Sequence, residues 1–424
     1  MFKKTTLKNG LRIITVPQKG TKAVTVLVLV ATGSKYEKKE INGISHFLEH
    51  MFFKGTKKRP VPITIAEPLD RVGGIYNAFT GEEYTGYFAK VDVKHFDLAL
   101  DVISDIYLNS KLDSKEIKKE KRVIIEEINM YYDHPSSYVQ SLWNKVLYGN
   151  QPAGRDIAGT KESVSNISRK QLKDYMRTQY IASNTIVCIA GNISKNVEAK
   201  AKRYFSKINT GSIIEKPLVI EKQTQPEVLL NFKDTDQTHF CLGVRGYNVF
   251  HPKKYVLELL GLILGGMMSS RLFIKVREEL GLAYYVKTGV SSDPDTGCLV
   301  TQAGVDNKRA GKAISAVLNE YKRISQNKIS SEELKKAKDH FKGKMSLFFE
   351  ASDARASFYA LQELLENKIL TPEEIYAKIN KVSVNDILKV SKDIFQPERL
   401  NLALIGPFRN KTKFQKLLWI KKNY

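Results

Sequence analysis

The sequence predicts an α+β protein made of two related domains, each a mixed β-sheet packed with helices. Three observations indicate this fold: the chain is long, strand-like and helix-like segments alternate along it, and their order recurs. Its 424 residues exceed one ordinary hydrophobic core and fit two domains of roughly 200 residues. Hydrophobic residues make up 42% of the chain, which is enough to fill both cores.

The first half alternates between apolar runs and helical patterns. Residues 1–17 predict two strands around the turn Lys8-Asn9-Gly10, because Asn-Gly favours a hairpin. The apolar run 23–31 predicts a buried strand, residues 43–53 a helix, and residues 75–91 a pair of strands. Further helical patterns cover 97–109, 114–132 and 171–180, and a second buried strand is expected at 184–192.

The order of these elements recurs in the second half at a nearly constant offset. The separation between Gly191 and Gly406 is nearly the same as that between Val26 and Phe240. Similar offsets along a chain indicate a duplicated domain. The recurring elements are a strand at 238–248, a helical stretch at 256–281 in the place of the helix at 43–53, and a strand at 400–407.

A polar stretch that contains Gly, Ser and Pro separates the two halves. We assign residues 1–210 to a first domain, 211–227 to a linker, and 228–424 to a second domain. The helix at 43–53 contains two histidines, whereas the corresponding stretch of the second half has Gly, Met and Ser. Any metal chemistry is therefore expected in the first domain.

The charge of the chain restricts its class of partner. Lys and Arg outnumber Asp and Glu by 68 to 45, a net charge of +23, which can indicate binding to nucleic acid or to an anionic surface. The lysines alternate with acidic residues, however, and this pattern is typical of solvated helix faces. The sequence contains no zinc-knuckle or helix-turn-helix pattern, so we expect no nucleic-acid partner.

The cysteines and the apolar runs predict the compartment. Cys188, Cys241 and Cys298 are far apart and odd in number, so neither a disulfide framework nor a cysteine zinc site is expected. The N-terminal stretch lacks an apolar signal core, and the longest apolar run is too short to cross a bilayer. We expect a cytoplasmic protein without stable membrane insertion.

The stretch 409–424 combines an apolar helical face, formed by Phe414, Leu417 and Leu418, with several lysines. A basic amphipathic helix of this kind can meet a membrane or a partner. More often such a helix packs on its own domain, and we favour this interpretation. The lysines are Lys413, Lys416, Lys421 and Lys422.

Residues 43–56 contain two of the seven histidines of the chain, four residues apart. His46 and His50 would share one face of a helix, with Cβ atoms about 5–6 Å apart, so both imidazoles can bind one zinc ion. Glu49 leans toward the same side, where it can take a proton from a metal-bound water and carry it to a leaving amine. The alternative is a pair of helical histidines that only cap or pack.

A catalytic zinc ion needs three protein ligands, so a carboxylate from another rigid element is expected. The helical pattern 114–132 offers Glu120, Glu126 and Glu127. Glu120 and Glu127 share a face, whereas Glu126 is turned by about 100° from Glu127. One of these acids should lie at the edge of the core, where an unpaired carboxylate is costly. The apolar neighbours that we expect to be buried are Val123, Ile124 and Ile128.

The histidine motif resembles the inverted zinc motif of the pitrilysin, or M16, family of metallopeptidases, which includes insulin-degrading enzyme and the mitochondrial processing peptidase. In that family a glutamate follows HxxEH at a fixed distance, and this distance, counted from His50, selects Glu127 over Glu126. The resemblance implies that His46, His50 and Glu127 bind one zinc ion per chain and that Glu49 is the general base. The family's second glutamate corresponds to Glu120, which would orient a histidine without binding the metal.

Residues 73–88 resemble the edge strand beside the active site of this family. The resemblance implies that Asn77 and the backbone of Ala78 hold the substrate as an added strand, a mode that binds mainly the peptide backbone. The alternative for this segment is an ordinary half-buried strand.

The second half also resembles the family, in a pattern that contains a substrate-facing Arg/Tyr pair. This pair corresponds to Arg277 and Tyr284, which would bind the scissile carbonyl and stabilise the oxyanion. Arg277 could instead form a surface ion pair with Glu278 or Glu279. Tyr285 is an alternative to Tyr284.

The family forms a clamshell of four such domains around a chamber, so the resemblance implies that this chain supplies half of it. Because the chain has both the zinc motif and the Arg/Tyr pair, we expect a homodimer rather than a heterodimer with a related chain. The expected function is a zinc-dependent endopeptidase that cleaves short unfolded peptides. The alternative is a non-catalytic peptide-binding or scaffold subunit of the same fold.

Overall fold

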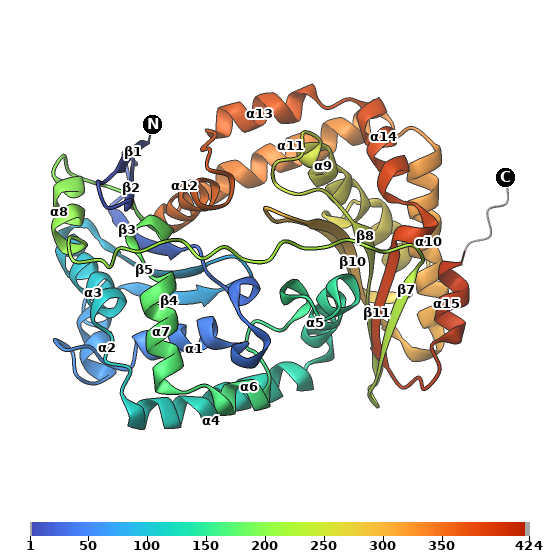
Figure 1. Cartoon of the computed structure of the whole chain (residues 1–424). Coiled ribbons are helices and arrows are strands. Elements are labelled where there is room, and N and C mark those ends of the chain that lie inside the picture. The colour runs from blue at the N-terminus through green and yellow to red at the C-terminus, as the bar shows by residue number, and fades with distance from the viewer. Residues whose placement is uncertain (1, 420–424) are drawn as a thin grey trace. The chain divides into compact units, whose positions relative to one another are not determined.

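The computed structural model describes residues 2–419, which fold into two compact units (Figure 1). The first unit contains the chain up to Asn129 together with residues 155–217 and 346–369. The second unit contains residues 130–154, 218–345 and the chain from Leu370 onward.

The first unit is built on a six-stranded mixed sheet with the strand order β1-β2-β6-β3-β5-β4. β2 and β6 pair in parallel, and all other neighbours pair antiparallel. β4 is therefore an edge strand, and it is joined to β5 by a tight hairpin. The strands are β1 (Lys3–Thr6), β2 (Arg12–Pro17), β3 (Ala23–Val30), β4 (Ile75–Thr80), β5 (Thr85–Asp92) and β6 (Thr185–Gly191).

The two faces of this sheet are covered by different helices. Val24, Val26 and Val28 of β3 face the main core, which also contains buried residues of α1, α3 and α7. Thr25 faces the opposite side, where α12 lies and where Thr25 Oγ1 is 2.9 Å from Ser352 Oγ. The helices are α1 (Ile44–Phe52), α2 (Ile63–Asp70), α3 (Phe96–Asn109), most of α4 (Ser114–Asp133), α6 (Lys161–Asn166), α7 (Arg169–Gln179), α8 (Val197–Tyr204) and α12 (Ser352–Glu366).

The second unit is built on a five-stranded mixed sheet with the strand order β7-β11-β8-β10-β9. β7 and β11 pair in parallel, and the other neighbours pair antiparallel. Its strands are β7 (Glu227–Phe232), β8 (Gln237–Arg245), β9 (Ala283–Ser292), β10 (Gly297–Asp306) and β11 (Leu400–Gly406). Its helices are α5 (Pro135–Tyr148), α9 (Lys254–Gly265), α10 (Ala310–Gln326), most of α11 (Ser331–Phe348), α13 (Pro372–Lys381), α14 (Val384–Ile394) and α15 (Thr412–Leu418), and a π-helix, η6, spans Phe273–Glu279.

The two sheets confirm the predicted α+β fold of two mixed sheets packed with helices. The predicted repeat is visible in the register of the strands. Val26 of β3 pairs with Ile189 of β6, and Phe240 of β8 pairs with Leu404 of β11. The corresponding residues of the two halves therefore occupy corresponding places in their sheets.

Two helices lie in the unit opposite to the one that their place in the sequence suggests (Figure 1). α5 comes from the first half, yet Trp143 and Leu147 pack in a core with Cys241 and Ala403 of the second sheet. α12 comes from the second half and covers the first sheet. The predicted domains 1–210 and 228–424 do not include this exchange, because an amphipathic pattern does not specify which sheet a helix covers.

Several smaller predictions concern burial. Ile124 is buried as expected, but the prediction for Val123 is wrong: its side chain points away from the core and is 49% exposed. In α15, Phe414 and Leu418 are buried, as expected for a tail that packs on its own domain. Lys421 and Lys422 lie outside the described residues. The three cysteines are buried and free. Within residues 2–419, none of the helices is long and apolar enough to cross a membrane.

Candidate metal centre

The N-terminus of α1 is fixed by Glu37, a buried carboxylate from the preceding loop. Glu37 Oε1 accepts a hydrogen bond from Ser45 N at 2.8 Å, and Oε2 accepts from Gly43 N at 2.7 Å and from Asn42 Nδ2 at 2.9 Å. A carboxylate at this end satisfies free N–H groups and complements the helix dipole. Burial raises the pKa of Glu37, and the hydrogen bonds from Ser45, Asn42 and Gly43 oppose this rise.

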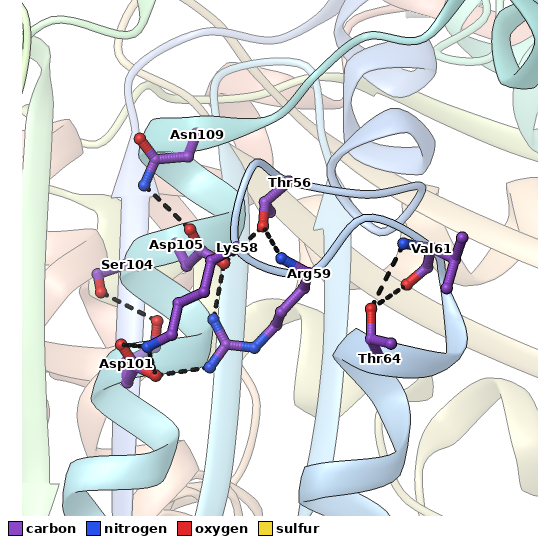
Figure 2. Close-up of polar contacts among 9 residues, drawn as sticks. All are labelled: Thr56, Lys58, Arg59, Val61, Thr64, Asp101, Ser104, Asp105 and Asn109. Atoms are coloured by element: carbon purple, nitrogen blue, oxygen red, sulfur yellow. Dashed lines mark hydrogen bonds and ion pairs between the residues drawn. The ribbon is translucent and has the colours of Figure 1, made fainter.

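The loop that follows α1 is fixed to α3 by a buried polar network, shown in Figure 2. Thr56 Oγ1 donates to Asp105 Oδ2 at 2.6 Å, and the Arg59 guanidinium bonds both Asp105, at 2.7 Å, and Asp101, at 2.6 Å. Lys58 pairs with Asp101 from the solvent side. Arg59 and Asp105 are both buried, so charge-assisted hydrogen bonds with little competition from water hold the segment after α1.

Three side chains from α1 and α4 converge on one point. His46 Nε2 and His50 Nε2 are 3.3 Å apart, and Glu127 Oε2 lies 3.6 Å from the first and 3.4 Å from the second. All three ligand atoms lie within 4.8 Å of one another. Two imidazole nitrogens and one carboxylate oxygen are a donor set that suits zinc and leaves a fourth position open. Glu126 points elsewhere and accepts a hydrogen bond from Asn129 at the surface.

Glu120 contacts one of these ligands, His50, at its other ring nitrogen. Its Oε2 lies 3.1 Å from His50 Nδ1, and its Oε1 lies 2.8 Å from the Lys54 ammonium. A carboxylate at Nδ1 fixes the orientation and tautomer of the imidazole and leaves Nε2 for a metal. The Glu120 side chain is nearly buried, and Lys54 compensates its charge.

The electrostatics around His50, which contacts both Glu120 and Glu127, favour a positive charge, whereas those around His46 do not. Burial and the neighbouring His50 lower the pKa of His46 to about 4. Burial also disfavours the charged form of His50, but its hydrogen bonds to Glu120 and Glu127 outweigh burial and raise its pKa to about 9. The hydrogen bond from His50 also lowers the pKa of Glu127. A site that stabilises a cation at this point fits a divalent metal ion.

Glu49 lies beside these ligands and has a different environment. Its Oε2 accepts a hydrogen bond at 2.5 Å from Oγ1 of Thr80, the last residue of β4. Burial raises the pKa of Glu49, and the Thr80 hydrogen bond opposes the rise. A carboxylate with a raised pKa is suited to accept a proton and then return it.

The edge strand β4 carries the two residues expected to bind substrate. Asn77 is exposed, and its Oδ1 accepts a hydrogen bond from Ala78 N at 2.9 Å. The side chain of Asn77 therefore occupies the amide that the resemblance assigns to the substrate. Ala78 itself packs against the core on the α1 side of the sheet.

Arg277 and Tyr284 lie side by side in the second unit, whereas the histidine cluster lies in the first. The Arg277 guanidinium is 4.8 Å from the centre of the Phe273 ring and 6.0 Å from that of Tyr284. Tyr284 is 78% exposed. Tyr285 points the other way, with its hydroxyl 2.9 Å from His239 Nδ1. The ion pair of Arg277 with Glu278 is long, at 3.7 Å, and exposed, so it is weak.

The sequence did not identify three residues that shape this centre: Glu37, Lys54 and Thr80. Thr80 lies within the strand pair predicted at 75–91, but nothing in that pattern distinguishes it from its neighbours. Glu37 reaches the helix from a loop, and Lys54 acts through Glu120. Neither belongs to a local pattern that spacing can reveal.

Comparison with known proteins identifies the family of this chain. Residues 12–161 match the family described as Insulinase (Peptidase family M16), and residues 166–341 match the Peptidase M16 inactive domain. A Bacillus subtilis protein named uncharacterized zinc protease YmxG is 38% identical over 97% of this chain and 99% of its own length. A Rickettsia felis protein named uncharacterized zinc protease is 32% identical over 95% of this chain and 96% of its own length.

Two solved structures have the same fold. A protease from Helicobacter pylori superimposes with a TM-score of 0.89 at 23% identity, covering 96% of this chain and 99% of that chain. A Pseudomonas fluorescens structure described as a peptidase M16 inactive domain has a TM-score of 0.88 at 17% identity, covering 96% of this chain and 98% of that chain.

Proposed function

The chain belongs to peptidase family M16, and from this premise we propose that it is a zinc-dependent endopeptidase whose metal is bound by His46, His50 and Glu127. The observation that carries the proposal is the convergence of these three donors within 4.8 Å, next to a carboxylate that can act as a base. The alternative, a non-catalytic peptide-binding or scaffold subunit, needs neither a complete donor set nor Glu49.

The residues around the donors supply the chemistry of peptide cleavage. A bound zinc ion would lower the pKa of a coordinated water and polarise the scissile carbonyl. Glu49 takes the proton of the attacking water and delivers it to the leaving amine, so one side chain serves as base and then as acid. Glu120 contacts His50 at Nδ1, which would leave Nε2 free to bind the metal.

The substrate would bind along β4, the edge strand of the first sheet. A peptide that adds a strand there must be extended and must have free backbone groups, so short unfolded peptides are the expected substrates. The peptide must also displace Asn77 Oδ1 from the Ala78 amide. In the free protein, Asn77 therefore protects an edge that would otherwise attract unwanted strands.

Arg277 and Tyr284 are proposed to bind the substrate carbonyl, as the family resemblance implies. The exposure of Tyr284 and its contact with the half-buried Arg277 support this role over that of Tyr285. Because one chain has both sets of residues, we propose a homodimer whose sites are completed by the partner. Light scattering coupled to size-exclusion chromatography tests this assembly, and a strict monomer would contradict it. The cytoplasmic location stays a prediction.

The test of the activity is hydrolysis of a quenched fluorescent peptide of about 20 residues, long enough to pair along β4. Zinc-loaded wild type is compared with Glu49→Gln, which keeps the shape and the metal ligands but removes the base. We expect hydrolysis by the wild type and at least about a 100-fold loss in the variant. Equal hydrolysis by both proteins would contradict the mechanism. Binding of the peptide without hydrolysis by either protein would favour the non-catalytic alternative.

A further inference from the structure

Thr80 is the last residue of β4, and its hydroxyl lies 2.5 Å from Glu49 Oε2. In the part of the chain that the structure describes, this hydroxyl is the one hydrogen-bond donor to the Glu49 carboxylate. The contact joins a strand to a helix, 31 residues apart in the sequence. The resemblance of residues 73–88 to the family gives roles to Asn77 and Ala78 but none to Thr80, so its contact with Glu49 needs its own explanation.

The alternation of β4 directs Thr80 toward α1. Residues two apart on a strand share a face, so Tyr76, Ala78 and Thr80 lie on one side of the sheet. Tyr76 and Ala78 pack against the core that contains Phe47 of α1. Thr80 continues this row beyond the apolar core, at the level where α1 presents Glu49. Its contact with Glu49 therefore follows from the register of the strand.

A backbone hydrogen bond and buried ion pairs hold the hairpin turn after Thr80, and they restrict the position of its hydroxyl. Gly81 N donates to Tyr84 O at 2.8 Å and closes the turn. Glu83 in this turn forms buried ion pairs with Lys35, at 2.8 Å, and with Lys216, at 2.6 Å. These pairs are almost inaccessible to water, which strengthens them and restricts the turn.

We propose that Thr80 is a positioning residue, which holds Glu49 Oε2 so that Oε1 remains available for proton transfer. This inference rests on the proposed function, because it takes Glu49 as the base. A glutamate side chain has three rotatable torsions, and without this hydrogen bond Glu49 would sample several orientations. Since Ala78 lies two residues away on β4, the base and the bound peptide would be placed by the same strand.

The first test compares Thr80→Val, which keeps the shape but removes the hydroxyl, with Thr80→Ser, which restores the hydroxyl. We expect kcat for the fluorescent peptide to fall about 10- to 100-fold in Thr80→Val, because misplacing a catalytic group has effects of this size. KM should change by less than about twofold, and Thr80→Ser should retain kcat within about threefold. Bound zinc, measured by mass spectrometry of the native protein, should be equal in all three proteins.

Thr85→Val is the matched control. Thr85 faces Thr80 across the hairpin, but its hydroxyl donates to Thr32 O at 2.9 Å. Loss of this hydroxyl tests whether any change in the hairpin lowers kcat, and we expect kcat to stay within about threefold of the wild type. Wild-type kcat in Thr80→Val would overturn the proposal. An equal loss in Thr80→Val and Thr80→Ser, or in Thr80→Val and Thr85→Val, would also overturn it.

Crystal structures of the zinc-loaded wild type and of both Thr80 variants test the inference without any turnover. We expect one orientation of Glu49 in the wild type and in Thr80→Ser, and a displaced or split side chain in Thr80→Val, with His46, His50 and Glu127 in place. An unchanged Glu49 in Thr80→Val would overturn the proposal whatever the activity. If no protein cleaves peptide but Glu49 moves in Thr80→Val alone, Thr80 does position Glu49 and the peptidase proposal is the one that fails.

Discussion

The two units of the chain share one framework, but the first unit alone places histidines and carboxylates around a common point within residues 2–419. In both sheets a parallel pair is followed by three antiparallel neighbours, and the first sheet has one additional strand at its edge, β1. The strands correspond as β2 to β7, β6 to β11, β3 to β8, β5 to β10 and β4 to β9. The exchange of α5 and α12 is also reciprocal.

The difference between the units lies in a few side chains on equivalent helices. α1 carries His46, Glu49 and His50, whereas α9 carries buried leucines and glycines. α11, which corresponds to α4, has glutamates in its first turn alone, where Glu333 pairs with Arg271. Instead, the second unit has a π-helix next to its edge strand, and such helices often mark functional sites. The comparison teaches that the framework folds without the metal donors, which can therefore be removed singly.

The largest effect is expected from removing a metal ligand. Glu127→Gln should lower zinc affinity by more than about 100-fold, because losing a ligand should cost more than losing a residue that only supports a ligand. The variant should also have no peptide hydrolysis. Glu126→Gln is the matched control, because Glu126 precedes Glu127 on α4 and bonds Asn129 at the surface. Zinc content after dialysis and hydrolysis rates check both variants. Equal zinc loss in the two variants would contradict the assignment of Glu127, rather than Glu126, as the metal ligand.

A smaller effect is expected from the network that fixes the loop after α1 (Figure 2). Asp105→Ala removes one of the two carboxylates that pair with buried Arg59, and Asp101 still compensates its charge, so the loss should be about 2 kcal/mol of local stability. Hydrogen–deuterium exchange measures the effect, with faster exchange expected in α1 and unchanged exchange in α9. Lys58→Met is the control, because Lys58 is mostly exposed and should change the exchange little. Equal acceleration in both units would contradict a local role.

Substitution of Glu120, which contacts His50 Nδ1, should reduce zinc affinity without removing a ligand. Glu120→Gln should weaken zinc binding about 10- to 100-fold, because Glu120 fixes the orientation and charge of His50. Competition with a chromophoric chelator measures the affinity. Glu116→Gln tests a glutamate one turn earlier that pairs with Lys119 at the surface, and it should bind zinc as the wild type does. A wild-type affinity in Glu120→Gln would contradict the supporting role.

The sequence predicts the parts of this centre that depend on local spacing. His46 and His50 are four residues apart, and helix geometry places them on one face. Glu127 follows from the spacing of the family motif, although periodicity leaves Glu126 open. The strand β4 is predicted by the alternation of aromatic and polar residues. The repeat is predicted by the nearly constant offset between corresponding segments of the two halves. These features can be predicted because each lies within one element or repeats at a fixed distance.

Other features depend on contacts between elements that are distant in the sequence. Thr80 reaches Glu49 only because a hairpin and a helix meet in the fold. The choice between Tyr284 and Tyr285 depends on which face of β9 is exposed, and both alternations are possible from the sequence. Val123 shows the converse error, since an apolar side chain next to buried Ile124 points to solvent. An apolar residue on a helix is often exposed, so its presence predicts burial poorly.

The smallest effect concerns pH and the carboxylate that caps α1. Burial raises the pKa of Glu37 above its usual 4.5, so the folded protein holds this proton more tightly than the unfolded chain does. The contribution of Glu37 to the free energy of unfolding is therefore complete below the unfolded pKa. It falls as pH rises through the interval up to the folded pKa. The free energies of unfolding of the wild type and of Glu37→Gln can be measured in urea at a series of pH values. The wild-type value minus that of Glu37→Gln should decline as pH rises over this interval.

Glu40→Gln is the control for this measurement, because Glu40 is an exposed acid three residues further along the same loop. Its difference from the wild type should show no comparable decline. A flat or rising difference for Glu37→Gln would mean that the hydrogen bonds from Ser45, Asn42 and Gly43 outweigh burial and hold Glu37 ionised. The second unit sharpens the comparison, because Glu37 and α1 belong to the first unit and α9 belongs to the second. Hydrogen exchange in α9 should therefore be the same in Glu37→Gln and in the wild type, while exchange in α1 differs between them.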